Sequence, residues 1–197
     1  MKIFKCLLVS SLIFFQASIC FAQDSINVSV GPDPTTHCHQ YRVDVNITKN
    51  STLGVMPSYN CTDRPDRPNN DGSMEINNQV TNIFNRILIP WRYSPYGAFN
   101  NGYFVEALVG VEKSEYKSVA GSSANVSFID TGVWLGYQWF WHNGLNISAV
   151  AGVAHLTTIS LDKSISPTES SDVSDYLDQQ TSTNTHMAGG VFFGWAF

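Results

Sequence analysis

Apolar and polar residues alternate with a period of two along most of the chain. The alternation is clearest in residues 40–48, 80–93, 103–112, 129–141 and 187–197. It is weaker in residues 26–30, 53–59 and 145–159. Because successive side chains of a strand point to opposite faces, this pattern predicts eight β-strands, each with one apolar face.

The two faces of the predicted strands differ in chemistry. One face is apolar and uncharged over most of the segments, whereas the other mixes Gly, Ala, Phe and Leu with charged residues. A soluble barrel would present a polar face rich in Lys and Glu to water. We therefore predict that the uncharged face contacts lipid.

The connections between the predicted strands alternate in length. Three of them are short, at residues 49–50, 94–101 and 142–143. The other four are moderate or long, at residues 31–39, 61–78, 118–123 and 160–182. Short periplasmic turns and longer external loops are typical of outer-membrane barrels. The predicted fold is all-β, an eight-stranded antiparallel up-and-down transmembrane β-barrel, with long external loops near 61–78 and 160–182.

The first 22 residues have the layout of a secretory signal. Lys2 and Lys5 precede an apolar run over residues 6–15, which is too short to span a bilayer as a helix, and Cys20 and Ala22 occupy the positions that a signal peptidase recognises. We predict a cleaved signal peptide at residues 1–22 and a single barrel domain at 23–197.

The amino-acid composition limits the classes of partner that the protein can bind. The chain carries a net charge of -5, and only 14% of its residues are charged against 43% hydrophobic. Such an acidic, exported chain has no electrostatic reason to bind DNA. We expect outer-membrane lipid as a partner and no nucleic acid.

Aromatic residues gather at the strand ends beside the short turns. This predicted girdle, typical of a membrane interface, comprises Trp91, Tyr93, Tyr103, Tyr137, Trp139 and Trp141, with Trp195 and Phe197 at the same level.

Two runs resemble Gram-negative outer-membrane barrel proteins. Residues 191–197 end in Phe, and the alternate aromatics Phe193, Trp195 and Phe197 look like the assembly signal of those proteins. Residues 136–147, followed by 151–154, are similar to a strand-turn-strand of small uncharacterised outer-membrane β-barrel domain proteins. The resemblance implies the cell outer membrane as location and the barrel-assembly machinery as partner, and it implies no activity.

The inward face of the predicted barrel carries three basic and four acidic residues. They are Arg42, Asp44, Arg86, Arg92, Glu106, Glu112 and Asp130. An eight-stranded barrel is just wide enough for side chains to fill its interior, so an open porin is not expected. Charges removed from bulk water must pair, and we favour a structural ion-pair network over an ion path or a proton relay.

Two cysteines follow the predicted signal peptide. Cys38 lies in the first external loop and Cys61 at the base of the second, and an oxidising compartment favours a disulfide between them. The alternative is a metal site at His37, Cys38 and His39, but on a strand the two His share a face and Cys points away. We expect neither a metal nor another cofactor.

The sequence supports an enzymatic role less strongly than a structural or surface-interaction role. His155 and Thr157 share the outward face, as His and Ser do in outer-membrane lipid A deacylases, but Thr replaces Ser and no outward acid is evident nearby. We expect a monomer with a structural or surface-interaction role, contacting an external protein or host partner through its loops. A lipid-A-modifying enzyme and a secreted soluble β-barrel that binds a small ligand are the alternatives.

Overall fold

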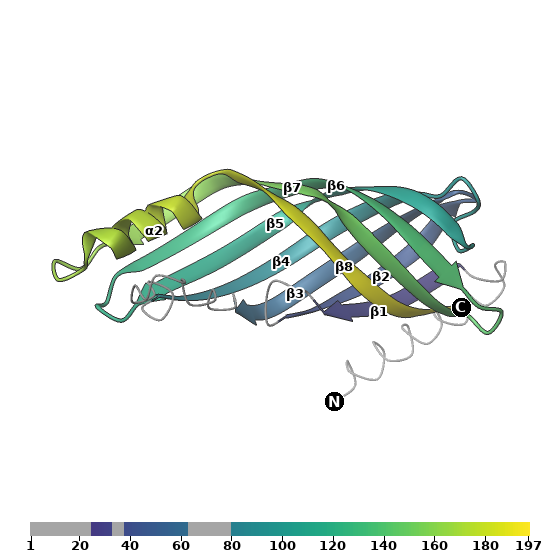
Figure 1. Ribbon diagram of the computed structural model, residues 1–197, viewed down its shortest axis with the longest axis horizontal. Coiled ribbons are helices and arrows are strands. Elements are labelled where there is room, and N and C mark those ends of the chain that lie inside the picture. Colours follow the sequence, from purple (N-terminus) through teal and green to yellow (C-terminus); the bar gives the residue numbers. More distant parts are fainter. Residues whose placement is uncertain (1–24, 33–37, 63–79) are drawn as a thin grey trace, which may run out of the picture.

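The computed structural model describes residues 25–32, 38–62 and 80–197, so the predicted signal peptide and most of the predicted loop at 61–78 lie outside the described residues. Eight antiparallel strands form a closed barrel in which neighbours in sequence pair and β1 pairs with β8 (Figure 1). The strands are β1 (Ile26–Pro32), β2 (His39–Thr48), β3 (Ser51–Thr62), β4 (Val80–Tyr93), β5 (Gly102–Ser118), β6 (Ser123–Phe140), β7 (Leu145–Ser164) and β8 (Asn184–Ala196). The predicted eight-stranded antiparallel fold is confirmed.

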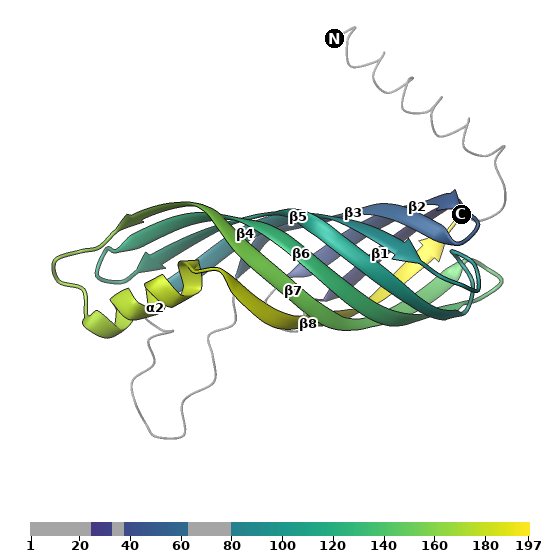
Figure 2. The same ribbon diagram turned by 90° about the horizontal axis from the view of Figure 1, so that it is seen from above.

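The two ends of the barrel are built differently. At one end, here called the terminal end, lie the turns at 49–50, 94–101 and 141–144 and the C-terminal residue, whose carbonyl accepts hydrogen bonds from the backbone N–H groups of Ser25 (2.7 Å) and Ile26 (3.2 Å). At the other, the helix end, the connection from β7 to β8 contains helix α2 (Ser171–Thr181) (Figure 2).

Strands β5, β6 and β7 extend beyond β1, β2, β3 and β8 at the helix end (Figure 2), and β4 accompanies β5, since Val80 pairs with Ser118. Strands β5, β6 and β7 contain 17, 18 and 20 residues, against 7 in β1 and 10 in β2. A bulge shifts the β6–β7 register, since Phe128 pairs with Thr158 and Ser127 with Ser160. Beyond the bulge the pairing with β6 continues, so β7 ends at Ser164, inside the segment predicted as a loop at 160–182.

Helix α2 occupies most of the remainder of that predicted loop. Ser170 caps the helix, its hydroxyl accepting a hydrogen bond from the backbone N–H of Val173 at 3.4 Å. Val173, Leu177 and Thr181, spaced by four residues, form one buried stripe. Val173 and Leu177 pack against inward side chains of β5 and β6, namely Tyr116, Ala124, Val126 and Phe128. The helix thus covers the inner face of the projecting strands.

Polar contacts also hold the β7–β8 connection to the strands. Lys163 Nζ lies 2.5 Å from Asp178 Oδ1, and the Ser118 hydroxyl donates to the carboxylate of Glu169. Hydrogen bonds from Ser118 and then Ser122 hold the pKa of Glu169 below its ordinary value. Because a lowered pKa means that the folded state favours the ionised carboxylate, this contribution is lost as the pH falls through that pKa.

Leu177→Ala tests the helix packing. Loss of this fully buried side chain is expected to weaken the docking of α2 by about 2 to 5 kcal/mol. Hydrogen exchange of the amides of residues 171–181 should accelerate while those of β2 to β4 keep their protection. Gln179→Ala, an exposed change on the same helix, is the control. Equal exchange in both variants would show that the helix does not depend on this packing.

Candidate functional site in the barrel interior

Four of the seven predicted inward charges form one buried ion cluster toward the terminal end. Arg42 donates from Nη1 and Nη2 to the two carboxylate oxygens of Glu106, at 2.9 and 2.6 Å, and from Nε to Asp44 at 2.7 Å. Arg92 Nε donates to the same Glu106 at 3.0 Å. All four side chains are almost completely buried. Glu106 thus accepts three charge-assisted hydrogen bonds, two from the bidentate contact with Arg42 and one from Arg92, and they compensate for its desolvation.

Gln138 joins the ion cluster to a terminal-end turn and was not among the predicted site residues. Its Oε1 accepts from Arg92 Nη1 at 2.8 Å, and its Nε2 donates to the carbonyls of Ala98 (2.9 Å) and Asn100 (2.8 Å). The Arg92 guanidinium also lies 3.8 Å from the ring centroid of Phe104, a cation–π contact. The only signal in the sequence was the position of Gln138 on the inward face of residues 129–141.

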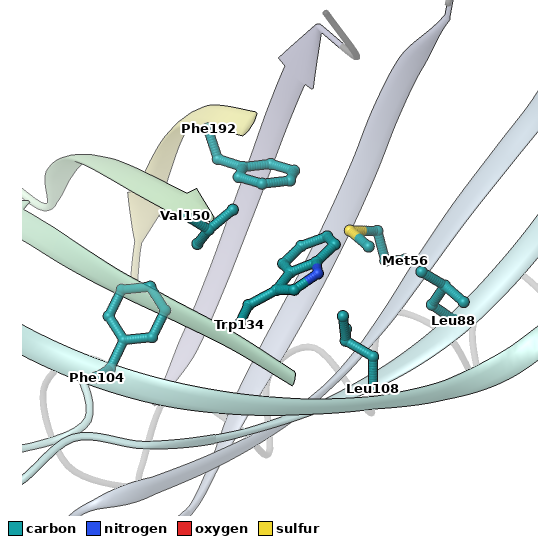
Figure 3. Close-up of a cluster of buried hydrophobic side chains, with 7 residues drawn as sticks. All are labelled: Met56, Leu88, Phe104, Leu108, Trp134, Val150 and Phe192. Carbon is teal, nitrogen blue, oxygen red and sulfur yellow. The ribbon is translucent and has the colours of Figure 1, made fainter. Parts of the chain in front are cut away.

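Seven buried apolar side chains form a layer inside the barrel (Figure 3). Its members come from six of the eight strands and are all buried: Met56, Leu88, Phe104, Leu108, Trp134, Val150 and Phe192. Side chains therefore fill the barrel at this level, as expected for an eight-stranded barrel.

The other three predicted charges lie on the far side of the apolar layer. Arg86 Nη1 is 3.9 Å from Glu112 Oε2 and 3.8 Å from Asp130 Oδ2. These distances exceed those of hydrogen bonds, in contrast to the ion cluster around Glu106. Glu112 accepts a hydrogen bond from the Ser114 hydroxyl at 2.9 Å. The predicted network is thus divided into a tight ion cluster and a looser triad of Arg86, Glu112 and Asp130.

A cavity of about 400 Å³ lies between this triad and helix α2. Its lining includes Arg86 and Glu112, Tyr116 of β5, Gln180 of α2 and His186 of β8. The cavity brings together segments that are far apart in the sequence.

Cys38 and Cys61 form the predicted disulfide, with their Cα atoms 4.8 Å apart. Both sulfur-bearing residues pack with Phe84 in a small buried cluster. His39 is exposed, and His37 lies outside the described residues. Within residues 25–32, 38–62 and 80–197, no group of three or more His, Cys, Asp or Glu is arranged to hold a metal ion.

The outer face carries the residues of the predicted girdle and of the resemblance to an assembly signal. Tyr103, Tyr137 and Trp139 make consecutive ring contacts across β5 and β6, with centroids 4.8 and 4.7 Å apart. The remaining members lie on β4, beyond the end of β6, and on or after β8, and they are exposed: Trp91, Tyr93, Trp141, Phe193, Trp195 and Phe197.

His155 lies on the same outer face. Its Nδ1 is 2.7 Å from the hydroxyl of Thr185 on β8, and Thr157 is exposed two residues further along β7. The hydrogen-bond partner of the imidazole is therefore a hydroxyl and not the carboxylate that a deacylase would use.

Comparisons with protein-family models, with curated proteins and with solved structures found no match. In the described part of the chain, no helix combines the length and the apolar character needed to cross a membrane.

Glu106→Gln tests the importance of the tight ion cluster. The change leaves two buried guanidinium groups with weakened compensation, and we expect it to lower the free energy of unfolding by roughly 3 to 5 kcal/mol. Glu112→Gln, in the looser triad, is the matched change and should cost about 1 kcal/mol. Denaturant unfolding followed by tryptophan fluorescence measures both. Equal losses of unfolding free energy in the two variants would show that the closer ion pairs of Glu106 do not stabilise the fold more than those of Glu112.

Proposed function

We propose that the protein is an integral outer-membrane β-barrel of a Gram-negative bacterium, with a structural or surface-interaction role at its helix end. The supporting observation is the uncharged apolar belt around the outside of the barrel. On β5 the outward side chains are Tyr103, Val105, Ala107, Val109 and Val111, followed by the charged Lys113, Glu115 and Lys117. The outward residues within 41–47, 129–139, 145–153 and 187–195 also include no Asp, Glu, Lys or Arg.

The height of the belt suits a bilayer. Ten residues of β5, 103–112, rise about 25 Å if each adds about 3.3 Å along a strand tilted by about 40°. That height is close to the roughly 25 Å apolar band of outer-membrane barrels. The aromatic residues border the belt at the terminal end, where such proteins have their periplasmic turns.

The projecting strands suit an aqueous environment outside this belt. Lys113, Glu115 and Lys117 of β5 point outward beyond it, as does the exposed Asn125 of β6. Helix α2 presents exposed Asp172, Asp175 and Asp178 on its solvent side. In the proposed orientation this polar helix end lies outside the cell and offers the surface for a protein or host partner.

The interior supports a role other than that of an open porin. The ion cluster around Glu106 and the apolar layer follow one another along the barrel axis, and both consist of buried side chains. A constitutive pathway for solutes would need these layers to separate.

Val109→Lys tests the location. Val109 is 50% exposed in the middle of the belt, and a lysine at the midplane of a bilayer is expected to cost about 2 to 4 kcal/mol. The variant should show a reduced yield of heat-modifiable protein in the outer-membrane fraction. Val119→Lys, in a helix-end turn where Val119 is 83% exposed, should match the wild type. Recovery of the wild-type protein in a soluble fraction would instead support the secreted soluble barrel.

Deletion of Phe197 tests the proposed assembly signal. Burial of one aromatic side chain would account for a loss of only roughly 1.5 to 3 kcal/mol, so refolding in detergent should be mildly impaired. In cells, the variant should accumulate as an unfolded, protease-sensitive chain, because the assembly machinery no longer recognises its last strand. Equal outer-membrane yields with and without Phe197 would contradict this role.

A further inference from the structure

A groove lies on the outer surface of the barrel, just beyond the apolar belt. It has a volume of about 410 Å³, and residues of four neighbouring strands, β4, β5, β6 and β7, line it. Lys113 is one of these residues, and it is the first charged residue after the uncharged outward positions of β5. The groove therefore lies at the border between the belt and the polar helix end.

Lys113 differs from the other lysines at this end of the barrel. Lys117 Nζ lies 2.8 Å from Glu115 Oε1, and Lys163 Nζ lies 2.5 Å from Asp178 Oδ1. Lys113 is exposed and forms no ion pair in the described part of the chain, and Glu115, the next outward residue of the same strand, is paired with Lys117. The ammonium group of Lys113 is therefore available to an anionic ligand.

One further carboxylate lines the groove, at Asp162 of β7. Strand β7 lies two strands away from β5, so about 10 Å separates their backbones at a strand spacing of about 4.8 Å. Exposed charges at such a distance are largely screened by salt at physiological ionic strength. Asp162 therefore does not neutralise Lys113.

Two hydroxyl groups lie in register with Lys113. Ser127 of β6 is the strand partner of Lys113, and Ser160 of β7 is the strand partner of Ser127. Both serines line the groove together with the lysine. The ammonium group and the two hydroxyls can all donate hydrogen bonds to the oxygens of a phosphate group.

An apolar row lies beside this polar row, on the side of the terminal end. It consists of Ile87, Val111 and Ile129, which are strand partners of one another and are exposed on the outward face. Val111 is two residues from Lys113 along β5, and Ile129 is two residues from Ser127 along β6. In a bilayer the phosphates lie directly outside the hydrocarbon core, so the two rows match the phosphate and the acyl chains of one lipid.

We propose that the outer surface around Lys113 binds a membrane lipid that carries a phosphate group next to its acyl chains. The Lys113 ammonium group and the hydroxyls of Ser127 and Ser160 contact the phosphate, and the apolar row contacts the acyl chains. This proposal rests on the proposed membrane location and adds to it the class of lipid that the barrel selects.

Binding of lipids to the purified protein in non-ionic detergent, measured by native mass spectrometry, tests the proposal. The probes are dimyristoyl phosphatidic acid and dimyristoylglycerol, which share their acyl chains and differ in the phosphate. We expect phosphatidic acid to bind about fivefold more tightly, the factor that one lysine contributes near an anionic headgroup. Inorganic phosphate, which has no acyl chains, should not displace the lipid at an equal concentration.

Three variants test the role of Lys113. Lys113→Gln should lower the affinity for phosphatidic acid to that for dimyristoylglycerol. Lys113→Arg should retain the preference, because a guanidinium group also donates to phosphate oxygens. Lys49→Gln removes the same charge from an exposed turn at the terminal end, so it is the matched control and should bind like the wild type.

Four results would overturn the proposal. They are equal affinities of the wild type for the two lipids, equal losses in Lys113→Gln and Lys49→Gln, loss of the preference in Lys113→Arg, and displacement of the lipid by an equal concentration of inorganic phosphate. None of them bears on the membrane location, which the fractionation of the wild-type protein decides separately. Recovery of the wild-type protein in a soluble fraction would overturn both proposals.

Discussion

Closure of the sheet is the constraint on which the rest of this structure depends. Among the described residues, the register of β1 with β8 covers four residue pairs, between Asn27–Val30 and Phe193–Ala196, and this pairing converts an open eight-stranded sheet into a barrel. Once the sheet is closed, every strand residue points either into a narrow interior or outward. Alternate residues of each strand therefore lie in two different environments, the barrel interior and the outer surface. For this reason the two faces of the strands differ strongly in chemistry.

The buried charged side chains of the interior are divided into two groups by a layer of apolar side chains. Glu106 lies between Arg42 and Arg92 and accepts hydrogen bonds from both, and the adjoining apolar layer separates this ion cluster from Arg86. Ion pairs deep in a protein compensate for their desolvation only when their geometry is close. The longer ion-pair distances around Arg86 occur beside the cavity that Arg86 and Glu112 line.

The period of two was sufficient to predict the strands and their faces, because it follows directly from strand geometry. The strand ends were harder to predict. Beyond residue 112, β5 alternates Lys113, Glu115 and Lys117 with Ser114 and Tyr116, and with polar residues on both faces the contrast on which the prediction relied disappears. Helix α2 was missed for a related reason: its acidic residues dominate the segment, and its apolar stripe consists of little more than Val173 and Leu177.

The sequence was sufficient to predict which residues face the interior, but not how their side chains pair. Alternation placed seven charged residues on one face, and the short and long connections indicated that Cys38 and Cys61 lie at the same end. Pair distances depend on register and on side-chain reach across the barrel, which no local pattern encodes. The two ends of the interior therefore differ: the close ion pairs around Glu106 lie toward the terminal end, whereas the longer ion-pair distances around Arg86 and the cavity lie toward the helix end. The helix end is held by other means, namely the Cys38–Cys61 disulfide and the packing of α2 on β5 and β6.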